Sequence, residues 1–199
     1  MKRFTLLMQV IVVSALVLPQ SPAMGQQALV VKPLVEKKLT ELPPGPLFWR
    51  LENFPTLEAA QAAAGPTSLA AQSRGKAWLF TLGPAGGASA GGTKVAEIGP
   101  IPRMTATQYL LRVNEGSGPP GSITPVHSHP GSEAFYVLAG ESTSRTPHGV
   151  MRVGSNQGAT GHGADTPMQV SSTGAVELQS LVMFVVDAAR PFSSPASFP

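Results

Sequence analysis

The feature of the sequence that most restricts its fold is a short stretch in which two histidines, a Pro-Gly pair and an acidic residue follow one another. His127 and His129 are two residues apart, so on a β-strand both imidazoles leave the same face. The Pro-Gly pair indicates a tight turn, and residues 133–138 have the β-branched and aromatic character of a returning strand. We therefore expect Glu133 to come back beside the two histidines.

Two neutral imidazoles and one carboxylate form a set that suits a divalent first-row metal with open coordination positions. We predict His127, His129 and Glu133 as ligands of a divalent transition metal whose identity stays open among Fe, Mn, Ni, Zn and Cu. The competing interpretation is a strand that carries two surface histidines and a solvated glutamate.

The N-terminus has the pattern of a secretory signal peptide. Two basic residues follow Met1, residues 4–18 are mostly apolar, and Ala23 and Gly25 supply small residues before a cleavage point. A membrane anchor is the alternative, but the apolar run is shorter than the roughly 20 residues of a spanning helix. We predict cleavage after Gly25 and a periplasmic or secreted protein. The chain has no Cys, so neither a lipidated cysteine nor a disulfide is expected.

Length and charge indicate one domain without a nucleic-acid or membrane partner. Removal of 25 of the 199 residues leaves 174, enough for a single core. The mature part has 12 Lys and Arg against 11 Asp and Glu. Its net charge of +1 is too small to indicate binding to nucleic acid or to an anionic membrane. The 21 Gly and 20 Pro favour many short strands joined by turns.

The N-terminal half is predicted to contain strands and one helix. The helix covers 56–65, because Thr56 is a suitable N-cap, the body is rich in Ala, and Gly-Pro ends it. Strands are expected at 29–42, 47–51 and 76–82, while 68–71 fits either a helical turn or a strand. Residues 83–93 are rich in Gly and small residues and predict a mobile surface loop.

The C-terminal half is predicted to be entirely β. Strands are expected at 107–113, 149–153, 168–171 and 175–186, the last of them apolar enough to be buried on both faces. Gly-rich loops separate these strands, and the tail from residue 191 has no regular pattern.

The histidine stretch resembles the first motif of the cupin superfamily, G-x5-H-x-H-x3-E-x6-G, and matches it at Gly121, His127, His129, Glu133 and Gly140. The resemblance implies an all-β fold, a cupin-type double-stranded β-helix or jelly-roll barrel, with a short N-terminal α/β extension. The domains would be a signal peptide at 1–25, an extension at 26–105 that packs on the barrel, and the cupin barrel at 106–199. Cupin relatives often pair through their barrels, so a homodimer is expected by resemblance.

The second cupin motif, which usually supplies one more histidine ligand, is degenerate here. Met168 stands at the position of that histidine within residues 158–172. Three interpretations stay open: Met168 is an apolar wall of the pocket and water or substrate completes the site, His162 takes the vacant place from its Gly-rich loop, or Met168 binds directly and favours copper.

Two functions compete on these residues. One is an exported metal-dependent enzyme of dioxygenase type that acts on a small organic molecule, with Glu133 as proton acceptor and with Phe135, Val137 and Met168 lining an apolar pocket. The alternative is a non-catalytic cupin that binds or senses a small molecule, with a structural metal or none. A chemically inert module would leave the His-x-His-x3-Glu pattern unexplained. The absence of clustered Arg or Lys near the motif argues against a sugar-phosphate substrate.

Overall fold

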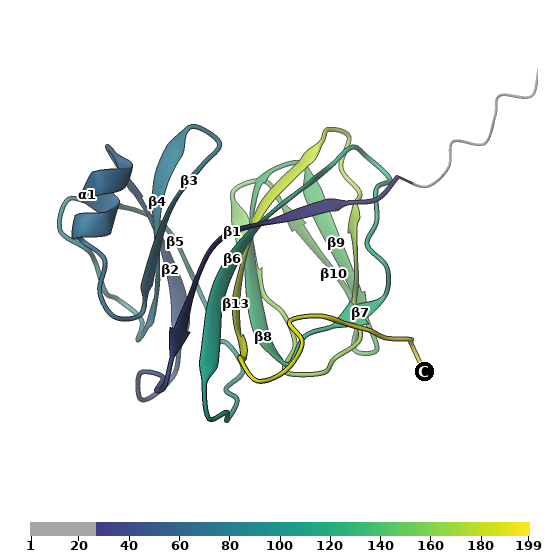
Figure 1. The fold of residues 1–199 in the computed structure, drawn as a ribbon. Coiled ribbons are helices and arrows are strands. Elements are labelled where there is room, and N and C mark those ends of the chain that lie inside the picture. The colour runs from purple at the N-terminus through teal and green to yellow at the C-terminus, as the bar shows by residue number, and fades with distance from the viewer. Residues whose placement is uncertain (1–26) are drawn as a thin grey trace, which may run out of the picture.

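The computed structural model describes residues 27–199, so the predicted signal peptide lies outside the described residues. Figure 1 shows a β-barrel with a smaller sheet and one short helix beside it. The elements in chain order are β1 (Val30–Leu39), β2 (Phe48–Phe54), α1 (Leu57–Ala62), β3 (Ser68–Ser73), β4 (Lys76–Gly83), β5 (Thr93–Ile98), β6 (Tyr109–Gly118), β7 (His127–Ser128), β8 (Gly131–Ala139), β9 (Glu141–Thr146), β10 (Gly149–Gly154), β11 (Gln157–Thr160), β12 (Gln169–Ser172), β13 (Leu178–Asp187) and β14 (Ser194–Pro195). Within residues 27–199 no helix has the length and apolar character needed to cross a bilayer.

The barrel consists of antiparallel sheets, as predicted for an all-β jelly roll. One sheet has the order β1-β6-β13-β8-β11, and a second has the order β10-β9-β12. β13 lies between β6 and β8 and is buried along most of its length, which agrees with its nearly continuous apolar sequence. The short strands β14 and β7 form a separate antiparallel pair.

A four-stranded sheet with the order β3-β4-β2-β5 packs beside the barrel, and α1 lies against it. Trp49 and Phe80 from this sheet share one buried apolar cluster with Leu111 and Met183 from the barrel. β1 also links the two parts, because it pairs with β6 along most of its length. The segment before residue 105 is therefore joined to the barrel by both a common core and a shared sheet.

Several elements differ in extent from the sequence prediction. α1 is shorter than predicted, although Thr56 caps it as expected, with its hydroxyl accepting a hydrogen bond from the Ala59 amide at 3.1 Å. The ambiguous residues 68–71 belong to a strand, β3. β9 and β11 were not predicted, because Glu141–Thr146 is almost entirely polar and Gln157–Thr160 lies in a Gly-rich stretch.

The loop at 83–93, predicted to be mobile, is anchored to the small sheet by a buried carboxylate. The Ser89 amide and hydroxyl donate hydrogen bonds to the two Glu52 oxygens at 2.8 and 2.7 Å. Arg50 Nε lies 3.1 Å from the same carboxylate. Burial raises the pKa of Glu52, but the hydrogen bonds from Ser89 and the charge of Arg50 outweigh it, so the pKa is lowered overall.

We expect Glu52→Gln to lower the free energy of unfolding at pH 7 by about 3 kcal/mol, because it removes the fully buried carboxylate that lies nearest to the partly buried Arg50. The pKa of Glu52 is lower in the folded than in the unfolded chain, so its contribution is present above the unfolded value of about 4.3 and disappears as pH falls through the folded value. Urea unfolding at pH 7 and at successively lower pH should therefore show the difference between wild type and variant shrinking below about pH 4. The exposed Glu177→Gln serves as control, and an equal effect of both variants would contradict this role of Glu52.

Candidate metal site and its cavity

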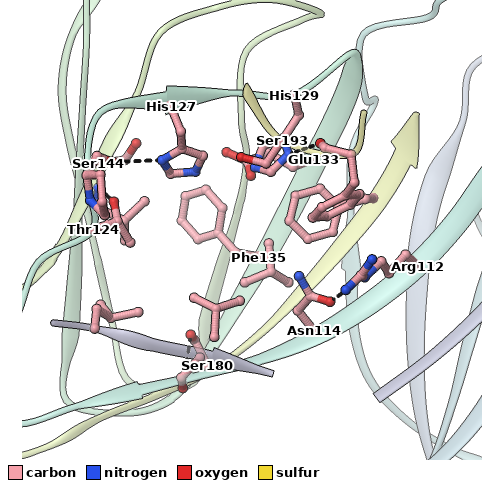
Figure 2. Close-up of a pocket in the computed structure, with 18 of the residues that line it drawn as sticks. Arg112, Asn114, Thr124, His127, His129, Glu133, Phe135, Ser144, Ser180 and Ser193 are labelled. Carbon is pink, nitrogen blue, oxygen red and sulfur yellow. Dashed lines mark hydrogen bonds between the residues drawn. The ribbon is translucent and has the colours of Figure 1, made fainter. Parts of the chain in front are cut away.

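The barrel encloses a cavity of about 590 Å³, within the range of small-molecule sites. Strands from both sheets and the C-terminal tail contribute to its wall (Figure 2). Polar and apolar residues both line the cavity, and most of the surface that they expose to it is apolar. The apolar lining includes Leu29, Val31, Phe135, Val170, Val182, Phe184 and Phe192, and the polar lining includes Arg112, Asn114, Thr124, His127, His129, Glu133, Ser142, Ser144 and Ser180.

His127 and His129 lie side by side in this wall, with ring centroids 5.0 Å apart and ring planes at 84°. His127 Nδ1 is 2.9 Å from the Pro125 carbonyl oxygen, and His129 Nδ1 is 2.7 Å from the Phe192 carbonyl oxygen. Because a carbonyl oxygen only accepts hydrogen bonds, Nδ1 must carry the proton in both neutral rings. Each Nε2 is therefore left with a free lone pair, the form in which an imidazole binds a metal.

The environment of His129 keeps its imidazole neutral. Burial lowers the pKa of His129 to about 4; the Phe192 carbonyl opposes this shift, while the neighbouring His127 and Arg112 add to it. At neutral pH the ring is therefore unprotonated at Nε2 and available as a ligand.

Glu133 is buried in β8, and burial alone raises its pKa to about 7. Gly161, just after β11, donates its amide hydrogen to the Glu133 carbonyl oxygen at 2.9 Å. A Cβ at position 161 would lie 2.5 Å from Glu133 Cγ and 2.8 Å from its Oε1. The missing side chain of Gly161 therefore makes room for the carboxyl group.

The structure places His127, His129 and Glu133 on one cavity, with His127 in β7, Glu133 in β8 and His129 in the short connection between them. Across residues 27–199, however, no three His, Cys, Asp or Glu side chains are close enough together to hold an ion as they stand. The chemistry of the donor set fits a divalent metal, because two imidazoles present free Nε2 atoms and the carboxyl has room beside Gly161. Binding of an ion by all three side chains would therefore require a change in their relative positions.

The other predicted site residues lie in different places. Phe135 lines the cavity, whereas Val137 is not in its wall and belongs to a buried apolar cluster with Phe135 and Leu178. His162 is not in the cavity wall; its ring packs against His148 with centroids 4.7 Å apart. Met168 is also absent from the wall, is buried, and exchanges two backbone hydrogen bonds with His127, of 2.8 and 3.0 Å. Met168 thus holds the histidine strand in place through its backbone.

Sequence reasoning missed the C-terminal tail, which crosses the site. β14 pairs with β7, so residues 194 and 195 lie beside the histidine strand. The Phe192 ring lies 4.8 Å from the His129 ring and 4.9 Å from Phe184, and the Arg112 guanidinium lies 4.2 Å above it. A two-residue strand has too little sequence pattern to be predicted, and the role of Phe192 depends on its backbone carbonyl, which no side-chain pattern reveals.

We expect deletion of residues 191–199 to weaken metal binding by about 10- to 100-fold, because His129 loses the carbonyl that fixes its tautomer and orientation. Titration with zinc or nickel against a chromophoric chelator measures this affinity. The matched control deletes 197–199 and keeps both Phe192 and the hydrogen bond from the Ala196 amide to Val126. Equal affinity in the two truncated proteins would contradict a role for the Phe192 carbonyl.

Comparison with known proteins gives relatives in structure only. No protein-family model and no curated protein sequence matches the chain. Among solved structures, it is similar to a cupin-like protein from Thermotoga maritima, with 15% identity, a TM-score of 0.39, and coverage of 44% of this chain and 65% of that one. It is also similar to the DMSP lyase DddQ from Ruegeria pomeroyi, with 22% identity, a TM-score of 0.37, and coverage of 43% of each chain.

A third neighbour is oxalate decarboxylase from Lactobacillus farciminis, with 14% identity, a TM-score of 0.38, and coverage of 43% of this chain and 26% of that one. The matched region spans less than two thirds of the length of each of these three proteins. The all-β fold with antiparallel sheets that the sequence predicted is confirmed by the strands of the structure itself.

Proposed function

We propose that this cupin-type barrel binds a divalent first-row transition metal through His127, His129 and Glu133, and acts on a small organic molecule in the adjoining cavity as a dioxygenase-type oxidoreductase. The observation that carries the proposal is the tautomer of the two histidines, because both Nδ1 atoms are engaged by backbone carbonyls and both Nε2 atoms are left free. A surface histidine pair has no need of such matched positioning.

The chain's own groups have distinct parts in this function. The two imidazoles hold the ion, which when bound supplies Lewis acidity and open positions for substrate and oxygen. The buried Glu133 carboxyl would complete the ligand set, and as a carboxylate beside the cavity it would accept a proton from the substrate. The apolar wall, with Phe135 and Phe184 near the histidines, excludes water from the reacting molecule.

The protein is further proposed to be exported. The basic, apolar and small-residue pattern of residues 1–25 supports a cleavable signal peptide and a periplasmic or secreted location. Cell fractionation with N-terminal sequencing of the mature protein tests this, and a chain that retains Met1 in the cytoplasm would contradict it. A homodimer is also proposed, and light scattering of the mature protein tests it.

The second candidate is a non-catalytic cupin that binds or senses a small molecule. It is favoured because, in the part of the chain that the structure describes, no three His, Cys, Asp or Glu side chains are placed to hold an ion together. It is also compatible with a cavity whose wall is mainly apolar.

Metal analysis and oxygen uptake separate these candidates. The protein is purified without chelator, its metal content is measured, and oxygen consumption is followed with phenols, aromatic acids and diketones. Stoichiometric metal with substrate-dependent oxygen uptake would support the enzyme, and metal without uptake would favour the binding protein. Protein that neither retains nor takes up any of the five metals would overturn the metal proposal.

A further inference from the structure

Two polar side chains on β6, Arg112 and Asn114, face the same cavity as the histidines (Figure 2). They are two residues apart and therefore share one face of the strand. Asn114 is only 2% exposed. Arg112 Nε donates a hydrogen bond to Asn114 Oδ1 at 2.9 Å, and the Arg112 guanidinium is held over the Phe192 ring at 4.2 Å.

The hydrogen bond from Arg112 fixes the orientation of the Asn114 amide. A guanidinium group can only donate, so the Asn114 atom that faces it must be the oxygen. The amide nitrogen Nδ2 therefore points the other way, and Figure 2 shows it turned into the cavity. Within residues 27–199, the side-chain hydrogen bond of Asn114 is the one that its oxygen accepts from Arg112. Because Asn114 lines the cavity, this nitrogen can donate to a bound molecule or to water there.

We propose that Asn114 and Arg112 form a binding site for the carboxylate group of a small ligand. The apolar body of this ligand would fill the cavity. The inference deepens the proposed function, since it names the chemical class of the substrate. Asn114 Nδ2 donates to a carboxylate oxygen, and the Arg112 guanidinium supplies the positive charge beside it. Arg112 is the one Lys or Arg among the described residues that line the cavity.

The rest of the cavity restricts the ligand further. A phosphate dianion would be expected to meet several cationic groups, and here a single guanidinium is partly offset by Glu36 at 3.6 Å. An aliphatic or aromatic monocarboxylic acid would pair its carboxylate with Arg112 and Asn114 and place its apolar body against the apolar wall.

Calorimetric titration with matched probes tests this inference. The acids are 3-phenylpropionate and octanoate, and the neutral analogues are 3-phenylpropan-1-ol and octan-1-ol. We expect wild type to bind at least one acid tenfold or more tightly than its alcohol, because the hydrogen bond and the charge act only on the acid. Asn114→Asp keeps the size of the side chain and its acceptor for Arg112 but removes the donor and adds a negative charge. The variant should lose tenfold or more in affinity for the acid and little for the alcohol.

Asn53→Asp on the small sheet is the matched control and should bind like wild type. Thermal unfolding checks that Asn114→Asp is folded. Equal affinities for acid and alcohol, unchanged acid binding by folded Asn114→Asp, or no binding of either acid would overturn the inference.

The titrations are done both on the protein as purified and after metal removal with EDTA, so that direct binding of a carboxylate to a metal is recognised. Discrimination between acid and alcohol that persists in protein unable to bind metal would leave this inference standing while the proposed metal function fails. Normal metal binding without discrimination between acid and alcohol would leave the proposed metal function standing while this inference fails. Asn114→Asp should keep the wild-type metal content, because Asn114 is not among the proposed ligands.

Discussion

His129→Ala is expected to weaken metal binding by at least about 100-fold and to abolish the metal content of the purified protein, because one of two prearranged imidazoles is lost. His127→Ala should have an effect of similar size, since its Nδ1 is fixed in the same way by a backbone carbonyl. Glu133→Gln should reduce affinity as well, because the amide is a weaker ligand than the carboxylate. Elemental analysis and competition with a chromophoric chelator measure these losses.

His148→Ala and His162→Ala are the matched controls, because these two histidines pack against each other outside the cavity wall. Both variants should retain wild-type metal content. Because His129 also packs against Phe184 and Phe192, the thermal stability of the metal-free variants is compared to separate unfolding from ligand loss. Metal lost in His162→Ala but retained in His129→Ala would contradict the proposed ligand set.

The sequence predicted the histidine strand and its returning partner well, because their pattern is local. Two histidines at a spacing of two share a face, and the acid four residues after His129 returns to the same cavity. The motif glycines also have a physical reason, since Gly121 has φ +86° and Gly140 has φ +76°, values that favour glycine.

The remaining parts of the site could not be predicted, because they depend on pairings distant in the chain. Phe192 reaches His129 across 63 residues, through a backbone carbonyl in a tail without strand pattern. Arg112 and Asn114 lie on a strand whose position beside the histidines is set by the barrel topology. His162 was a candidate only because its Gly-rich loop could bend, and the loop instead places it against His148.

The structure of the loop at 83–93 also depends on a contact with a distant residue that the sequence does not reveal. Its composition predicts mobility, because Gly and Ala bury little side chain. One serine in it, Ser89, meets the buried carboxylate of Glu52 on a neighbouring strand and fixes the loop. Composition describes the average tendency of a segment, whereas a single buried partner decides its structure.

Gly131→Ala is expected to lower the free energy of unfolding by more than about 3 kcal/mol or to prevent folding, because the added methyl group has no space. A Cβ at position 131 would overlap the Val185 carbonyl oxygen and lie 2.6 Å from Val186 Cα and 2.8 Å from Met104 Sδ. The methionine can move, but the two backbone atoms belong to β13, the strand between β6 and β8. Relief of the overlap would therefore require β8 to separate from the centre of its sheet.

Gly83→Ala at the end of β4 is the matched control, since a Cβ there has nothing within 4 Å. Urea unfolding should place Gly83→Ala within about 1 kcal/mol of wild type and Gly131→Ala far below it. Similar midpoints for the two variants would contradict the close packing of β8 on β13. If Gly131→Ala folds, its shifted strand should also weaken metal binding, because position 131 lies between His129 and Glu133 and sets how far apart these two proposed ligands stand.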